Sequence, residues 1–321
     1  MPLVEKSTYE PSLLFKNKHF NTVYRTFFHI PGINYKRERL ELMDGDFIDI
    51  DISSVNSGKV VVAIHGLEGS SQSTYIQSLS KLLNQNNYDV IAVNLRGCSG
   101  ESNRLLSSYH SGKTEDLDFV IQHLDNQYNY KEINIVGYSL GGNLTLKYLG
   151  EMNTTSKIKS AVGISVPCDL KASALEMNTF TNKLYLQMFL KSLRQKGLKK
   201  LHEFPSSFLT VDAINSVKNF KDFDDIYTAP AHGFKNAEDY WDKSSCKQYI
   251  PSIKIPTLLI TSLDDPFFNE NCYPIKEAKE NNNFFMETPK YGGHVGFSTN
   301  LNIKQNIWCE SRILSFLNHL K

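Results

Sequence analysis

Residues 133–142 have the sequence INIVGYSLGG, a short β-branched run followed by a G-x-S-x-G motif. The apolar run predicts a buried strand, and the residues after the motif predict a helix. A turn that lifts a serine off the end of a strand strains the backbone and brings other backbone close, so glycine is needed two residues to either side. Ser139 would then stand at a helix N-terminus, where free amides and the helix dipole stabilise developing negative charge. The stretch predicts a strand, a nucleophile turn and a helix.

The same alternation of short strands and helical patterns extends from Lys59 towards the end of the chain, which is typical of a mostly parallel sheet covered by helices. Strands are predicted at 59–65, 89–94, 133–136, 160–166, 257–262 and 284–288. Helices are predicted at 74–85, 114–126, 141–150, 274–280 and 302–320. Upstream, Asp44-Gly45 joins segments 35–42 and 47–52 as an antiparallel hairpin. The sequence therefore predicts a mostly parallel sheet of eight strands, flanked by helices.

The alternation is interrupted between Asp169 and Cys246, where a long segment separates two strands that a simple crossover would join with far fewer residues. We therefore expect a cap at 169–246, inserted into a core made of residues 1–168 and 247–321. Within the cap, helical spacing over 180–201 places three apolar residues on one stripe, and these are Phe180, Leu184 and Met188. The stripe favours packing inside the cap, with contact to a bound acyl chain as the alternative.

A serine hydroxyl is a weak nucleophile and needs a base, together with a carboxylate that orients the base and stabilises its cation. Asp264 and Asp265 directly follow the predicted strand 257–262, and His294 follows the next strand in the sequence YGGHVG. The order Ser, Asp, His is that of the α/β-hydrolase fold. We expect His294 to be the base for Ser139. Adjacent residues that leave a strand point in different directions, so only one of the two acids can readily meet the imidazole.

Acyl transfer also needs amides that hold an oxyanion, one from the residue after the nucleophile and one from the loop after an earlier strand. These amides are expected to be those of Leu140 and Leu67. Leu67 lies in the sequence HGLEGS at 65–70, where Gly66 lets the loop turn. The two amides and Ser139 together predict a site for acyl transfer.

Two further loops follow the strand 89–94, with the sequences RGCSGE at 96–101 and YHSG at 109–112. We interpret them as loops that brace the site, with a role in shaping the pocket as the alternative. His110 is followed at the fifth position by Glu115, so the H-x-x-x-x-D spacing of acyltransferases is absent.

Composition narrows the class of protein further. The 321 residues, 40% of them hydrophobic, suffice for one large α/β domain with an insertion. A net charge of +1 without a basic run gives no indication of a nucleic-acid partner and favours a small neutral or amphiphilic substrate. The five cysteines are odd in number and lack metal-ligand spacing, so we expect neither a disulfide framework nor a zinc site. No stretch approaches the ~18 to 20 apolar residues of a transmembrane helix, so a cytoplasmic location is expected, with peripheral membrane contact left open.

With these motifs assembled, the chain resembles the YheT-like branch of the α/β-hydrolases, a bacterial group similar to eukaryotic ABHD-type lipid esterases. The match spans nearly the whole chain. It rests on Asn17, His19 and Thr22, on DGDF at 44–47, on the three loop sequences at 65–70, 96–101 and 109–112, on GYSLGGN at 137–143, on DDPF at 264–267 and on GGHVGF at 292–297. The resemblance implies an α/β-hydrolase fold and hydrolysis of carboxylic esters, with Ser139, Asp265 and His294 at the positions of the family triad.

The resemblance also favours one of the two acids. In related hydrolases the working acid precedes one variable residue and an apolar pair, which selects Asp265 before Pro266, Phe267 and Phe268. Asp264 would then brace the loop.

The expected activity is hydrolysis of an acyl-lipid or other apolar ester through an acyl-serine, with no metal or organic cofactor. An acyltransferase or a thioesterase would use the same triad, and a non-catalytic ligand-binding protein on this fold is the alternative from another class. The intact set of serine, acid and histidine favours the enzyme. A serine nucleophile excludes the carboxylate-nucleophile chemistry of epoxide hydrolases and dehalogenases. The natural ester and the oligomeric state are not indicated by the sequence.

Overall fold

A nine-stranded sheet forms the centre of the computed structural model, which describes the chain except residues 1–2, 5, 28–31, 153–154, 303–306 and 320–321. The strand order is β1-β9-β8-β7-β6-β4-β5-β3-β2. The strands are β1 (Leu3–Val4), β2 (Lys36–Glu41), β3 (Phe47–Ser53), β4 (Lys59–Ile64), β5 (Asp89–Asn94), β6 (Glu132–Tyr138), β7 (Ile158–Ile164), β8 (Thr257–Ile260) and β9 (Phe284–Glu287). The predicted α/β-hydrolase fold is confirmed.

The sheet has one strand more than the eight predicted, because β1 pairs in parallel with β9 at the edge. Two residues are too few to show a strand periodicity, so the sequence pattern missed β1. The predicted hairpin is confirmed, since β2 and β3 run antiparallel around Asp44-Gly45, and β3 is also antiparallel to β5. All other described pairs in the sheet are parallel.

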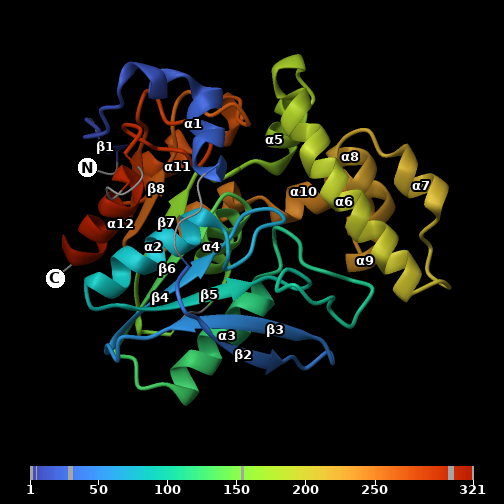
Figure 1. The fold of residues 1–321 in the computed structure, drawn as a ribbon, viewed down its shortest axis with the longest axis horizontal. Coiled ribbons are helices and arrows are strands. Elements are labelled where there is room, and N and C mark those ends of the chain that lie inside the picture. The colour runs from blue at the N-terminus through green and yellow to red at the C-terminus, as the bar shows by residue number, and fades with distance from the viewer. Residues whose placement is uncertain (1–2, 5, 28–31, 153–154, 303–306, 320–321) are drawn as a thin grey trace.

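Helices cover both faces of the sheet (Figure 1). They are α2 (Thr74–Gln85), α3 (Thr114–Gln127), α4 (Leu140–Glu151), α11 (Ile275–Glu280) and α12 (Trp308–His319). The short helix α1 (Lys18–Tyr24) packs instead against the loop at 293–296. Alternate residues of β4 belong to opposite cores: Val61 shares its core with apolar residues of α2 and α12, and Val62 with those of α3 and α4. The last helix begins at Trp308 rather than at the predicted 302, and 303–306 lie outside the described residues.

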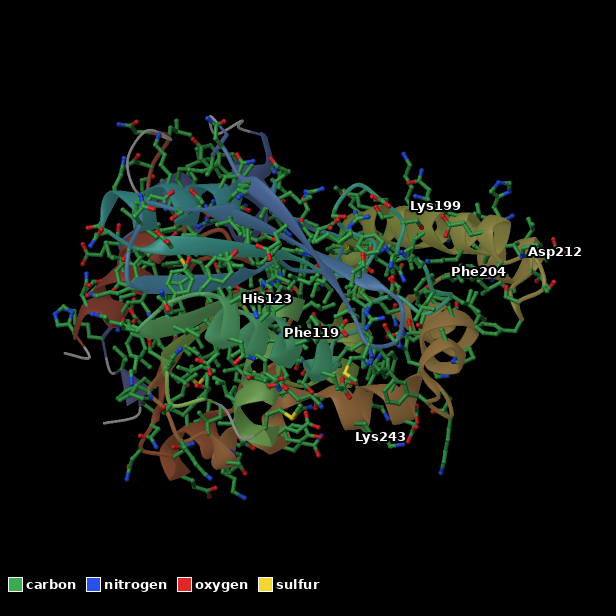
Figure 2. The ribbon with its side chains drawn as sticks, turned by 90° about the horizontal axis from the view of Figure 1, so that it is seen from below. Phe119, His123, Lys199, Phe204, Asp212 and Lys243 are labelled. Carbon is green, nitrogen blue, oxygen red and sulfur yellow. The ribbon has the colours of Figure 1, made fainter. Side chains whose placement is uncertain are left out.

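The segment between β7 and β8 contains a separate group of helices that extends to one side of the sheet (Figures 1 and 2). They are α5 (Leu170–Glu176), α6 (Lys183–Glu203), α7 (Val211–Ser216), α8 (Phe220–Phe223), α9 (Ala229–His232) and α10 (Ala237–Ser244). Asp224–Thr228 adds a turn of π-helix. These helices have their own apolar cluster, in which Leu190 and Ile214 of the segment meet Phe267 of the core. Figure 2 shows Asp212 at the far end of this arm and Lys199 along one side of it.

The apolar stripe predicted for the cap interior lies on the surface instead. Phe180 is 90% exposed, Leu184 80% and Met188 68%. The face of α6 that packs inward consists of Leu186, Leu190, Leu193, Gly197 and Lys200. Both sets have helical spacing, so the pattern alone could not tell which one is buried. Packing inside the cap is therefore the wrong interpretation of this stripe.

Lys200 can be buried in that inward face because its amine donates hydrogen bonds to the carbonyls of Asn103 and Leu105, at 2.8 and 2.6 Å.

Among the described residues, no helix combines the length and the apolar character that crossing a bilayer requires.

Candidate active site

Ser139 occupies a sharp turn between β6 and α4, with φ 51° and ψ −117°. This backbone conformation is rare for a residue with a side chain, and a fixed framework must hold it. The Ser139 amide donates to the carbonyl of Ile164 on β7, at 2.8 Å, and the Ser139 carbonyl accepts from the amide of Asn143 in α4, at 3.0 Å. The serine side chain is thereby held above the carboxyl end of the sheet.

Glycine is required at two positions of this turn because backbone approaches closely. A Cβ on Gly137 would lie 2.3 Å from the carbonyl oxygen of Gly141, and a Cβ on Gly141 would lie 2.5 Å from that of His65. Both distances are far shorter than a van der Waals contact, and the atoms approached are main-chain atoms that cannot move aside. The glycines of the motif thus allow α4 to pack directly on β6 and on the loop after β4.

The imidazole of His294 lies between a hydroxyl and a carboxylate. Its Nε2 is 3.0 Å from Oγ of Ser139, and its Nδ1 is 2.9 and 3.2 Å from the two carboxylate oxygens of Asp265. Because a carboxylate only accepts, Nδ1 carries the proton and Nε2 is left to accept from the serine hydroxyl. This arrangement can remove a proton from Ser139 and support the imidazolium that results.

The two adjacent acids do different things. Asp265 is buried, contacts the imidazole and also accepts from the amide of Phe267 at 3.0 Å. Asp264 turns the other way, and its Oδ1 accepts from the amide of Gly293 at 2.9 Å. Burial raises the pKa of Asp264. The structure therefore brings Asp265 to the His294 imidazole. It brings Asp264 to the backbone of the loop that carries His294.

The loop around His294 is fixed by the N-terminal part of the chain, which the sequence motifs alone do not reveal. The His294 amide donates to Oγ1 of Thr22 in α1, at 2.9 Å, and the next amide, of Val295, donates to Oγ of Ser165, at 2.9 Å. Gly293 has φ 60°, and a Cβ there would lie 2.5 Å from Oγ1 of Thr22. Thr22 belongs to the motifs that carry the family resemblance, which was the one signal available for it.

The loop after β4 lies directly against the nucleophile. A Cβ on Gly66 would come within 3.2 Å of the Ser139 Cβ, and the Gly66 amide donates to Oη of Tyr75 at 3.0 Å. Among the hydrogen bonds of the described residues, none uses the amides of Leu67 and Leu140. Both amides are thus available to an oxyanion beside Ser139.

His65 fixes the turn that carries the Leu67 amide. Its Nδ1 lies 2.7 Å from the Gly66 carbonyl, and its Nε2 accepts from the Leu95 amide at 3.1 Å. The ring is fully buried, and burial lowers the pKa of His65 to about 4. His65 is therefore a neutral structural residue at neutral pH.

A second polar group connects this loop to the cap. Nζ of Lys196 in α6 lies 2.6 Å from Oε1 of Glu68, and Oη of Tyr109 donates to the same oxygen at 2.6 Å. Tyr109 also accepts from the Glu68 amide at 2.9 Å, and the Lys196 amine lies over its ring, 4.4 Å from the centroid. Glu68 directly follows Leu67, so a cap residue helps to hold the loop that carries a predicted oxyanion amide.

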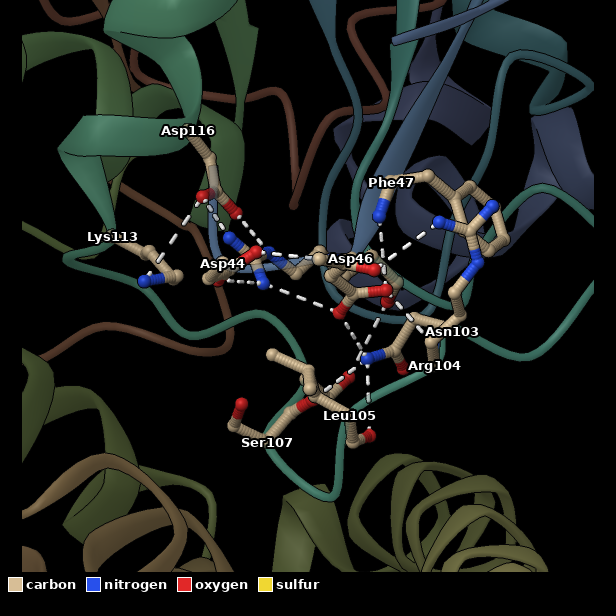
Figure 3. Close-up of polar contacts among 12 residues, drawn as sticks. Asp44, Asp46, Phe47, Asn103, Arg104, Leu105, Ser107, Lys113 and Asp116 are labelled. Carbon is tan, nitrogen blue, oxygen red and sulfur yellow. Dashed lines mark hydrogen bonds and ion pairs between the residues drawn. The ribbon is translucent and has the colours of Figure 1, made fainter. Parts of the chain in front are cut away.

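The loop containing Arg96 braces the site from further away. The Arg96 guanidinium pairs with Asp116 at 2.6 and 2.7 Å and with Asp44 at 2.7 Å. Asp46 joins the network, because its carboxylate accepts from the Arg96 guanidinium at 3.2 Å and from the side chain of Asn103 at 2.6 Å (Figure 3). These contacts agree with the bracing interpretation of the 96–101 loop, whereas Tyr109 both braces and lines the cavity described next.

A cavity of about 580 Å³ extends from Ser139 and His294 between the sheet and the cap. Its lining is mostly apolar and includes Leu67, Met177, Tyr185, Phe189, Leu193 and Phe268. Phe267 packs against the His294 ring with centroids 4.3 Å apart. The volume is in the range of small-molecule sites, and the lining suits an apolar ligand with a reactive polar group at Ser139.

Comparison with known proteins identifies a family and two relatives in sequence. A family model described as the alpha/beta hydrolase fold matches residues 59–301. The Escherichia coli (strain K12) protein named "Putative esterase YheT" is 33% identical over 310 residues, covering 94% of this chain and 91% of the relative. Phospholipase ABHD3 of Bos taurus is 28% identical over 324 residues, covering 98% and 79%.

Among solved structures, the Pyrococcus furiosus esterase Pf2001 has a TM-score of 0.59 at 20% identity, covering 90% of this chain and 91% of that one. At this identity the likeness concerns the fold alone.

Proposed function

This chain belongs to the α/β-hydrolase family, and from that premise we propose that it is a serine esterase that cleaves carboxylic esters with apolar acyl groups. The observation that carries the proposal is the continuous line of hydrogen bonds from Asp265 through His294 to Ser139, placed beside an apolar cavity. The residues 169–246 act as the cap that closes this cavity. Substrate enters between the cap and α1.

The reaction follows from the geometry. Nε2 of His294 takes the proton as Oγ of Ser139 attacks the ester carbonyl, and the amides of Leu67 and Leu140 hold the oxyanion. When the tetrahedral intermediate collapses, the alcohol leaves with the proton from His294, and an acyl-serine remains. Water then gives a proton to His294 and attacks the acyl-serine, and His294 returns the proton to Oγ of Ser139 as the acid leaves. Asp265 stabilises the imidazolium in both halves.

The cavity supports an apolar substrate. Phe267, Phe268 and Phe189 surround the approach to His294 without offering a hydrogen-bond donor or acceptor, so an acyl chain would lose no polar contacts on binding. The relatives named as esterase and phospholipase favour the same substrate class, an acyl-lipid or a similar apolar ester.

Hydrolysis of a series of p-nitrophenyl esters, from acetate to long acyl chains, tests the proposal. The wild type should hydrolyse the series with KM falling as the acyl chain grows, because each added methylene buries apolar surface in the cavity until it is filled. A thioester series and an added alcohol acceptor, measured in parallel, separate hydrolysis of esters from thioesterase and acyltransferase activity. Absence of hydrolysis across the ester series contradicts the proposal.

A further inference from the structure

The exposed stripe of the cap is unusual because large apolar side chains on a protein surface are normally scattered. Phe180, Leu184 and Met188 follow one another at intervals of four residues, so they share one side of the turn that leads into α6. All three are more than two-thirds exposed. Exposing these side chains to water is unfavourable. They are exposed although the neighbouring face of α6 is buried inside the cap.

The stripe reaches the cavity at Met188, beside the proposed entrance. Met188 lines the cavity as well as the surface, as do its neighbours Tyr185 and Phe189. The hydroxyl of Tyr185 contacts Nδ1 of His19 in α1 at 3.3 Å, so α1 and the beginning of α6 touch beside this entrance. The short 3-10 turn before α1 adds another apolar side chain, that of Leu13, which is 84% exposed.

The same elements carry positive charge. The helix α6 contains six lysine or arginine residues and a single acid, Glu203, at its far end, where it pairs with Lys200. Lys183 and Lys191 are exposed on the turns that carry the stripe. Residues 13–24 add Lys16 and Lys18 and contain no acid. This local excess stands out in a chain whose net charge is only +1.

We propose that the beginning of α6, together with the 3-10 turn before α1, docks on the surface of an anionic lipid bilayer and brings the cavity entrance against it. The apolar stripe enters the acyl boundary, and the lysines beside it meet lipid phosphates. This is the design of interfacial helices, which combine an apolar face with a cationic one. An acyl chain can then pass from the bilayer along Met188 into the cavity with little exposure to water.

A second copy of the chain fits this surface less well. A two-fold dimer would place the stripe against itself, and Lys183 and Lys191 would face their own copies. A stable protein interface also buries about 1,200 Å² or more, far more than three side chains present. The cationic rim therefore favours an anionic lipid surface over self-association.

Co-sedimentation with vesicles tests the docking surface. Wild type and the double variant Phe180→Ser/Leu184→Ser are mixed with vesicles of phosphatidylcholine, with or without phosphatidylglycerol. The wild type should bind the anionic vesicles, and the variant should bind about tenfold to hundredfold less, because two apolar anchors are lost. Lys183→Gln/Lys191→Gln should lower binding to anionic vesicles about tenfold and leave the weak binding to neutral vesicles unchanged.

Met43→Ser is the matched control, since Met43 is 98% exposed in the turn between β2 and β3, outside α6 and the 3-10 turn before α1. This variant should bind vesicles as the wild type does. Neither Phe180 nor Leu184 lines the cavity, so hydrolysis of soluble p-nitrophenyl acetate should be equal in all variants. Because binding and soluble hydrolysis are measured separately, an inactive wild type would contradict the proposed esterase function without affecting the docking result.

Two kinds of result overturn the docking proposal. One is a wild type that fails to sediment with anionic vesicles, or a serine variant that sediments as well as the wild type. The other is a wild type that is dimeric by light scattering while Phe180→Ser/Leu184→Ser is monomeric, which would assign the stripe to contact between two copies of the chain.

Discussion

The carboxyl edge of the sheet and the cap both line the cavity, but they are held in different ways. At the sheet edge, backbone meets backbone so closely that Gly137 and Gly141 leave no room for a Cβ. The cap contributes side chains from helices with an apolar cluster of their own, which Phe267 and Phe268 of the core join, and polar contacts such as Lys196 to Glu68 add to this link. We therefore expect the proposed chemistry at the sheet edge and substrate selection in the cap.

Ser139→Ala removes the proposed nucleophile at the sheet edge and should have the largest effect on activity. Losing the nucleophile should lower kcat by about 10⁴-fold or more while the fold is kept, because alanine fits wherever serine does. Steady-state kinetics and labelling with a fluorophosphonate probe measure this. Labelling of the variant at wild-type strength would mean that another residue is the nucleophile.

The adjacent acids allow a sharper test of the same region. Asp265→Asn should lower kcat by about 10³- to 10⁴-fold, because the amide leaves the His294 imidazole poorly oriented and its cation unsupported. Asp264→Asn should cost much less, since an amide oxygen can still accept from Gly293. The two variants are compared at matched thermal stability. A larger loss for Asp264→Asn would move the triad acid to that position.

Lys196→Met tests the link between the two regions. Without the ammonium, Glu68 loses one of its two side-chain partners and the Leu67 amide is held less firmly, so kcat should fall about tenfold with KM almost unchanged. Lys199→Met, on an exposed position of the same helix, is the control and should behave as the wild type. Equal kinetics for both variants would show that the cap does not position this loop.

The smallest effect is expected from a substitution in the cap, Asp224→Asn, measured as a change in the stability of the whole protein. Asp224 lines the cavity, and burial raises its pKa to about 7, above the usual 3.8. The folded state therefore binds a proton that the unfolded state releases, and this contribution to stability is lost as pH rises from 3.8 to about 7. Relative to wild type, Asp224→Asn should gain stability over this range. Urea unfolding at several pH values measures it, and a difference that does not change with pH would contradict the assignment.

The sequence was a good guide where one residue type is dictated by sterics. Ser139, His294 and their glycines could be predicted because a strained turn and a close backbone approach admit few alternatives, and the structure brings the predicted residues together. Choosing Asp265 over Asp264 required the family pattern, because either carboxylate could follow the strand.

Other features depend on tertiary packing and could not be predicted from the sequence pattern. Two stripes of α6 have helical spacing, and only the position of the helix on its neighbours decides that Leu190 is buried and Leu184 is not. The strand β1 is too short to have a pattern, and the bond from Thr22 to the His294 loop joins distant parts of the chain. Long-range contacts of this kind leave no local trace in a single sequence.

That last contact sets the order in which the enzyme can become active during its synthesis. The hydroxyl of Thr22 and the amide of His294 are 272 residues apart in the chain. At ~5 to 20 residues per second, a ribosome makes the second partner roughly 15 to 50 s after the first. Ser139 and His294 are 155 residues apart, so for roughly 8 to 30 s of that time the chain contains the serine without a base beside it. The proposed nucleophile is therefore inactive until the His294 loop has been made and has met Thr22 in the N-terminal part of the chain.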